Sequence, residues 1–253
     1  MRVIRSLVIA FSTYSRIPMP QVEWSDENRK YTMCFFPLIG AVIGLVLWGW
    51  LALCDFAGIG AFVRGAVAAL IPLFITGGIH MDGFMDTSDA MASWQPTERR
   101  LEILKDSHVG AFAVMGCAGY LLLFAGVFSE ADSLAAPFLI PCFVISRALS
   151  AFALACLKSA RPGGMMDAFA RAAHLRMVGI GAAVYTLICL GAWVFSGIWC
   201  ALICAVSAAG CFAYYRHMAY KNFGGVTGDL AGWFVQVTEL VLAVAVVFGG
   251  KFI

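Results

Sequence analysis

Three aspartates, Asp82, Asp86 and Asp89, follow a long apolar run and carry the clearest chemical signal in the sequence. In a helix, positions i, i+4 and i+7 place all three carboxylates on one face. Like charges held so close repel one another unless a cation lies between them. Mg²⁺ is the natural candidate, because it takes oxygen ligands and commonly bridges carboxylates to substrate phosphates. The alternative is a solvated acidic helix start, since Asp is favoured near the positive end of the helix dipole.

Neighbouring residues could complete such a site. His80 stands two positions before Asp82 and could serve as a metal ligand or an acid–base partner. Lys105 could contact a phosphate, and Asp106 could complete the metal's ligands or orient Lys105. A surface charge pair that reflects membrane topology explains Lys105 and Asp106 equally well.

Two arginines stand in unusual places. Arg147 lies in the middle of an apolar run, where a charge costs about 2.5–3.5 kcal/mol on insertion scales. It therefore needs a partner, and either a substrate diphosphate or Glu239 in the last apolar run would supply one. Arg161 precedes a Pro-Gly-Gly turn at 162–164. This turn could clamp an anion, or it could be a plain turn.

A second polar cluster, residues 222–229, precedes the last apolar run and reads Asn-Phe-Gly-Gly-Val-Thr-Gly-Asp. Gly225 would let backbone N–H groups approach a phosphate, while Thr227 and Asp229 add a hydroxyl and a carboxylate. The pattern Gly-Gly-x-x-x-Asp ends here at Asp229 and also occurs earlier, ending at Asp82. Duplicated halves would explain this repetition, and so would chance in a glycine-rich chain.

The composition predicts that these groups belong to a polytopic membrane protein. Hydrophobic residues make up 62% of the chain and charged residues 13%, and the mean hydropathy is +0.87. Soluble domains are about 45–50% apolar and about 25% charged. The net charge of +2 and the lack of basic runs with interleaved aromatics argue against nucleic acid as a partner. The nine cysteines lie in apolar runs and are predicted to be small core residues.

Seven apolar runs approach the length of about 20 residues that crosses a bilayer. They are 34–54, 58–79, 109–128, 134–157, 177–196, 198–215 and 233–250. Residues 1–11 are expected to form an interfacial helix at the N-terminus. Because no linker divides the chain, we predict a single all-α domain, residues 1–253, built as a bundle of about seven transmembrane helices.

Most lysines and arginines fall in the connections on one side of these spans, which the positive-inside rule assigns to the cytoplasm. They are Arg2, Arg5, Arg16, Arg29, Lys30, Arg99, Arg100, Lys105, Lys158, Arg161, Arg171, Arg176, Arg216 and Lys221. The three aspartates lie on the same side. We therefore expect the N-terminus and an active site at the cytoplasmic face of the membrane.

Acidic, basic and glycine-rich segments together favour metal-assisted transfer chemistry on a diphosphate at the membrane surface. A cation would neutralise the bridging phosphates, and arginine would take developing negative charge. Two other classes stay open. A transferase acting on a prenyl or lipid diphosphate should show a second Asp-rich box, and a transporter should place its ionisable residues near the bilayer midplane.

The same segments resemble a known family, the cobalamin synthases or adenosylcobinamide-GDP ribazoletransferases. The resemblance covers nearly the whole chain in order and rests on residues 11–20, 78–89, 100–112, 160–164 and 224–229. It implies that α-ribazole or its 5′-phosphate attacks adenosylcobinamide-GDP with release of GMP, a late step of cobalamin assembly that requires Mg²⁺. The substrates would be small molecules and the location the bacterial cytoplasmic membrane.

Pattern and resemblance together give one set of expected site residues. Metal ligands are expected at Asp82, Asp86, Asp89 and Asp106, catalytic groups at Asp82, Asp229 and His80, and substrate contacts at Lys105, Arg147, Arg161, Gly225 and Thr227. Membrane lipid should surround the protein. A homo-oligomer, or a complex with other enzymes of cobalamin assembly, is left open.

Overall fold

The structure is a computed structural model that describes residues 2–161, 163 and 165–249. These residues form helices and connections, without a strand among them. The helices are α1 (Arg2–Tyr14), α2 (Asp26–Arg29), α3 (Thr32–Ala57), α4 (Ala61–Thr76), α5 (Ile79–Ala92), α6 (Thr97–Ile103), α7 (Ala111–Ser129), α8 (Ala136–Cys156), α9 (Met165–Ala172), α10 (Leu175–Ser196), α11 (Ile198–Phe223) and α12 (Gly228–Gly249).

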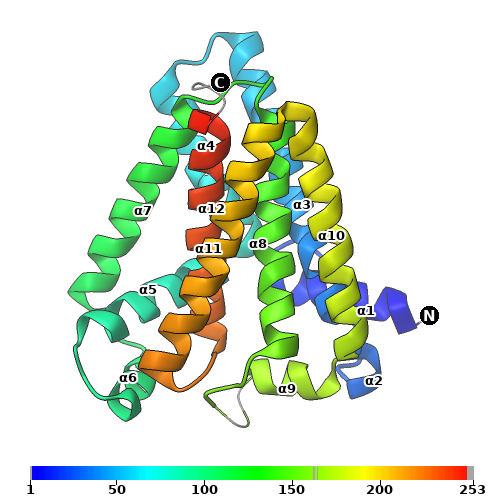
Figure 1. Ribbon diagram of the computed structural model, residues 1–253, viewed down its shortest axis with the longest axis vertical. Helices are drawn as coiled ribbons and strands as arrows, with labels where there is room; N and C mark the ends of the chain where they lie inside the picture. The colour runs from blue at the N-terminus through cyan, green and yellow to red at the C-terminus, as the bar shows by residue number, and fades with distance from the viewer. Residues whose placement is uncertain (1, 162, 164, 250–253) are drawn as a thin grey trace.

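Six of these helices, α3, α7, α8, α10, α11 and α12, are long and apolar enough to cross a membrane, and the bent pair α4–α5 would make a seventh span. The predicted all-α polytopic membrane fold is therefore confirmed. Figure 1 shows them as an upright bundle with α7 and α10 on its flanks. In the most apolar windows of α8 and α12, 72% and 67% of residues are buried, so these two helices form its centre.

Small residues let α3 lie directly against α8. A Cβ atom added to Gly40 would lie 2.1 Å from the carbonyl oxygen of Phe143, and one added to Gly44 would lie 2.8 Å from the Cα of Ile140. Close backbone approach of this kind is how helices associate in lipid, where burial of apolar surface gives little drive. The two glycines thus fix α3 beside the central helix.

The predicted span 58–79 differs from the observed helix. α4 ends at Thr76, and the chain turns by 100° into α5. Gly77 and Gly78 make this turn with φ of 66° and 79°, a left-handed conformation that glycine adopts without strain. The 16 residues of α4 span about 24 Å, less than the roughly 30 Å hydrocarbon core. The hydropathy of the sequence did not predict that the helix ends at Thr76.

The polar helices gather at one end of the bundle. Figure 1 shows α1, α2, α5, α6 and α9 in its lower part, with α5 and α6 near the start of α7 and with α1, α2 and α9 on the side of α10. This end carries the segments in which most lysines and arginines were predicted to share one side. The helix expected at the N-terminus is present as α1, and its place at a membrane interface stays a prediction.

Candidate functional site

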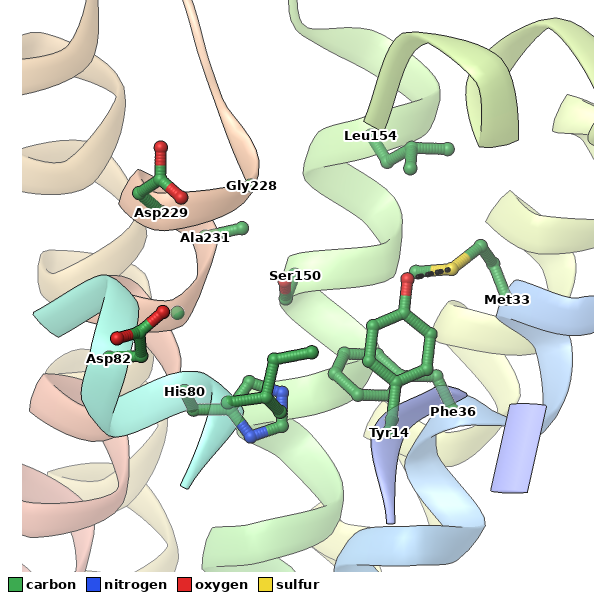
Figure 2. Close-up of a pocket in the computed structure, with 12 residues that line it drawn as sticks. Tyr14, Met33, Phe36, His80, Asp82, Ser150, Leu154, Gly228, Asp229 and Ala231 are labelled. Atoms are coloured by element: carbon green, nitrogen blue, oxygen red, sulfur yellow. Dashed lines mark hydrogen bonds between the residues drawn. The ribbon is translucent and has the colours of Figure 1, made fainter. Parts of the chain in front are cut away.

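Two helix starts meet at the polar end of the bundle. Asp82 lies in the first turn of α5, and Asp229 lies in the first turn of α12. The helices cross in direct contact, because a Cβ atom added to Gly83 would lie 2.6 Å from the backbone oxygen of Asp229. Only glycine permits so close an approach. The crossing brings two carboxylates that are distant in sequence to one side of a single cavity (Figure 2).

The first glycine of the repeated Gly-Gly-x-x-x-Asp pattern ends a helix in both places. Gly77 ends α4 with φ 66°, and Gly224 ends α11 with φ 72°. Each glycine provides the left-handed residue that commonly terminates a helix. The next helix begins two residues after Gly77 and four residues after Gly224, and its first turn holds Asp82 in one case and Asp229 in the other. In both places the pattern therefore ends one helix and places an aspartate in the first turn of the next.

Arg161 reaches Asp229 because the connection after α8 is tied to the connection before α12. The N–H of Val226 donates to the oxygen of Lys158, and the N–H of Ala160 donates to the oxygen of Val226, both at 2.9 Å. Arg161 then lies with Nη1 3.5 Å from Asp229 Oδ2, and its Nη2 donates to a backbone carbonyl of α6. The predicted basic and acidic groups thus form one ion pair.

The segment before α12 is held mainly by its own backbone. Thr227 Oγ1 accepts the N–H of Leu230 at 3.2 Å, which caps α12, and lies 3.5 Å from Asp229 Oδ2. The N–H of Gly225 donates to a carbonyl of α11, and a Cβ atom added there would lie 2.5 Å from the oxygen of Lys158. Thr227 and Gly225 therefore build the site, while their contact with a phosphate stays a prediction.

Asp82 and Asp229 line a cavity of about 180 Å³, here called the inner cavity (Figure 2). Its other walls are mostly apolar and come from separate helices: Tyr14 from α1, Phe36 from α3 and Leu154 from α8. The two carboxylates stand together on one side, and the aromatic rings lie at the far side. The inner cavity therefore has a charged wall and an aromatic wall.

A second and more open cavity of about 940 Å³, here called the outer cavity, lies between the end of α1, the end of α4 and the start of α5. Arg16, Thr13 and Met85 contribute to its walls. Asp82 lines this cavity as well as the inner one. A ligand bound at Asp82 would therefore be accessible from both the inner and the outer cavity.

The carboxylates are crowded around Asp86. Partial burial, together with the charges of Asp82, Asp229 and Asp89, raises the pKa of Asp86 to about 7, while the charge of Arg161 opposes this rise. Of the charges that act on Asp86, three are negative and only that of Arg161 is positive. Such a cluster favours a bound cation.

Within the described part of the chain, no three His, Cys, Asp or Glu side chains converge closely enough to enclose a metal ion by themselves. The residues present nevertheless fit Mg²⁺, which keeps several waters and is commonly held by one or two carboxylates together with substrate phosphates. Asp82 is exposed and Asp86 is half-buried, and both contribute oxygen donors next to the two cavities. These two carboxylates would suffice for an ion that arrives with a diphosphate.

The other two predicted ligands have protein partners. Asp89 accepts the N–H of Gly110 at 2.7 Å and the N–H of Ala113 at 2.8 Å, one with each carboxylate oxygen. It therefore caps the start of α7. Asp106 accepts the N–H of His108 at 3.0 Å, a bond that lowers the pKa of this exposed carboxyl. Metal binding by Asp89 or Asp106 stays a prediction.

Arg147 has the second of the two partners that the sequence left open. Its guanidinium pairs with Glu239, both side chains are 1% exposed, and Nη1 also donates to the oxygen of Phe143 at 3.0 Å. Lys105 is exposed after α6, and His80 lines the inner cavity. Pro162 and Gly164 of the predicted anion-binding turn lie outside the described residues.

Sequence reasoning missed the aromatic wall of the inner cavity. Phe36 and Ser150 lie in apolar spans and look like ordinary core positions. Tyr14 and Arg16 fall within residues 11–20, one of the segments that carry the family resemblance, but nothing in their spacing indicated a cavity. Only the fold shows that these four residues border the two carboxylate-lined spaces.

Comparison with known proteins shows which family the chain belongs to. An adenosylcobinamide-GDP ribazoletransferase from Lachnoclostridium phytofermentans is 42% identical over 247 residues, covering 98% of this chain and 95% of the relative. Relatives with the same description from Clostridium botulinum and a Geobacillus species are 31% and 35% identical and cover 94% and 87% of this chain. No solved structure matches. The match to the family described as cobalamin-5-phosphate synthase runs over residues 6–247, and the chain belongs to that family.

Proposed function

We propose that this protein transfers α-ribazole, or its 5′-phosphate, to adenosylcobinamide-GDP and releases GMP. The product is adenosylcobalamin or its 5′-phosphate, and the reaction is the final step of nucleotide-loop assembly. The observation that carries the proposal is the family match over residues 6–247, together with the crossing of α5 and α12 that joins Asp82 and Asp229 at one cavity.

The reaction is a phosphoryl transfer. A ribose hydroxyl oxygen of the ribazole forms a bond to the phosphorus next to the cobinamide, and the bond from that phosphorus to the oxygen of the departing GMP breaks. The attacking hydroxyl is not the 5′ one, because the 5′-phosphate of the phosphorylated substrate is kept in the product. The hydroxyl proton goes to a carboxylate. Asp82 or Asp229 is placed to accept it, because both line the inner cavity and Asp82 also faces the outer one.

Mg²⁺ is the cofactor that we propose for this site. When bound between carboxylate and diphosphate, it would neutralise the phosphate oxygens and stabilise the leaving group. Asp82 and Asp86 would hold it, in keeping with the excess of carboxylates over the guanidinium of Arg161. Arg161 would help to offset the negative charge of the leaving phosphate.

The protein is further proposed to lie in the bacterial cytoplasmic membrane with its active site toward the cytoplasm. The positive-inside rule supports this orientation, because the basic segments occupy the end of the bundle that holds α5 and the start of α12 (Figure 1). Water-soluble nucleotide substrates would then reach the site without crossing the membrane.

Substitution of Asp82 by Asn tests the proposal. The amide keeps the size of the side chain but removes its charge, so GMP release from adenosylcobinamide-GDP and α-ribazole should fall by about 10²–10⁴-fold. Asp132→Asn is the matched control: Asp132 caps the connection at the other end of the bundle by accepting the N–H of Ala135, and Asn can do the same. Its activity should match the wild type.

Chelation of divalent cations should abolish GMP release, and added Mg²⁺ should restore it. Near wild-type turnover by purified Asp82→Asn protein would refute the assignment of this carboxylate. Turnover that persists in the chelator would refute the metal. A wild-type protein that instead consumes a prenyl or lipid diphosphate, without releasing GMP from the corrinoid substrate, would overturn the proposed function itself.

A further inference from the structure

The phosphoryl transfer proposed above assigns no step to the aromatic wall of the inner cavity. Tyr14 and His80 present nearly parallel rings, with an interplanar angle of 8° and centroids 6.3 Å apart. Phe36 stands 5.5 Å from His80 between ring centroids, and Leu154 closes the cavity from α8. Flat, apolar walls of this kind suit a planar aromatic ligand.

His80 adds one specific polar contact to this wall. The residue is 5% exposed, and neither of its ring nitrogens has a hydrogen-bond partner. Buried polar groups in proteins nearly always have partners, so an imidazole left in this state calls for one from outside the chain. Figure 2 shows its ring at the inner cavity, opposite Ser150 and beside Tyr14 and Phe36.

The size of the inner cavity limits what enters it. An apolar cavity of about 150 Å³ takes up benzene, and this cavity measures about 180 Å³. A small planar ring system therefore fits, whereas a corrin ring with its side chains does not. The outer cavity, at about 940 Å³, is left for the larger substrate.

We propose that the inner cavity is the binding site for the aromatic base of the ribazole substrate, with His80 hydrogen-bonded to the base. This inference rests on the proposed function. The base is a dimethylbenzimidazole, which is flat and apolar and keeps one ring nitrogen free to accept the N–H of a neutral imidazole. With the base against Tyr14 and Phe36, the attached ribose extends toward Asp82 and Asp229, where its attacking hydroxyl is to react.

Filling the cavity provides the test. Ser150 is 4% exposed and lines the cavity from α8, so Ser150→Leu places a larger side chain in the space of the base. The KM for α-ribazole should rise at least tenfold, and the KM for adenosylcobinamide-GDP should stay unchanged. Ser207→Leu is the matched control, because Ser207 is half-buried in α11 and lines neither cavity.

A change in base selectivity separates lost binding from general damage. Relative to wild type, Ser150→Leu should favour the α-riboside of unmethylated benzimidazole over α-ribazole, since that base is smaller by two methyl groups. His80→Phe keeps an aromatic ring but removes the N–H donor. It should weaken binding of α-ribazole about tenfold, measured by calorimetry on the detergent-solubilised protein, with the KM for the corrinoid substrate unchanged.

The outcomes distinguish this inference from the proposed function. If wild-type protein releases no GMP, the proposed function fails, and the inference fails with it. If the wild type is active but Ser150→Leu and His80→Phe bind α-ribazole normally, the inference alone is wrong. A rise in KM for the corrinoid substrate and not for α-ribazole would assign the cavity to the other substrate and overturn the inference.

Discussion

Gly83 is the position at which a single methyl group should stop the reaction. In Gly83→Ala the new Cβ would lie 2.6 Å from the oxygen of Asp229 and 2.9 Å from its Cα. Both atoms belong to backbone, so no side chain can rotate away. Ordinary van der Waals contact begins at 3.4 Å, and α5 must therefore move from α12 by about 0.8 Å. Overpacking of this kind costs about 1–3 kcal/mol, which a folded bundle can tolerate.

The displacement separates Asp82 from Asp229, and misplacement of reacting groups by about 1 Å can lower a rate by about 10²-fold. We expect kcat for GMP release to fall by nearly that factor. Thermal unfolding and size-exclusion chromatography should show that the protein remains folded. Gly210→Ala is the control, because a Cβ atom at this α11 position meets no atom within 4 Å. If Gly83→Ala keeps more than half of the wild-type kcat, the close crossing does not position the carboxylates as described.

Two further variants test the groups around the site. Arg147→Met leaves Glu239 buried without its partner and should lower the free energy of unfolding by about 3–5 kcal/mol. Adding Glu239→Gln to this variant should restore much of the lost stability. Equal melting temperatures for Arg147→Met and the wild type would contradict the pairing. Asp89→Ala removes the cap of α7 and should cost about 0.5–2 kcal/mol without changing the Mg²⁺ concentration for half-maximal activity. A tenfold rise in that concentration would instead show that Asp89 holds the cation.

Hydropathy was sufficient to predict the long helices, because lipid requires continuous apolar helical segments. It was insufficient at 58–79, where the apolar run continues across Gly77 and Gly78 but the backbone turns. It also placed the end of the sixth span at residue 215, although α11 continues to Phe223. Hydropathy indicates whether a residue prefers lipid or water, whereas the end of a helix depends on where the backbone conformation changes.

The site was predictable in its residue types more than in its assembly. Asp82 and Asp229 were selected separately, and their shared Gly-Gly-x-x-x-Asp pattern was visible, but nothing in the sequence indicated that the two helix starts would cross at Gly83. Asp89 lies on the same helical face as Asp82, yet the start of α7 covers it. Such differences depend on which segment packs over a residue, and that is a property of the tertiary fold.

The buried pair of Arg147 and Glu239 also constrains how the protein is made. Synthesis proceeds from the N-terminus, so Arg147 enters the membrane 92 residues before Glu239 is added. During that interval a guanidinium is unfavourable in lipid, and α8 must remain near the insertion machinery or the headgroups. The helix that neutralises it is the one that brings Asp229. A chain that ends before α12 therefore lacks both Asp229 and the partner that compensates the buried charge of Arg147.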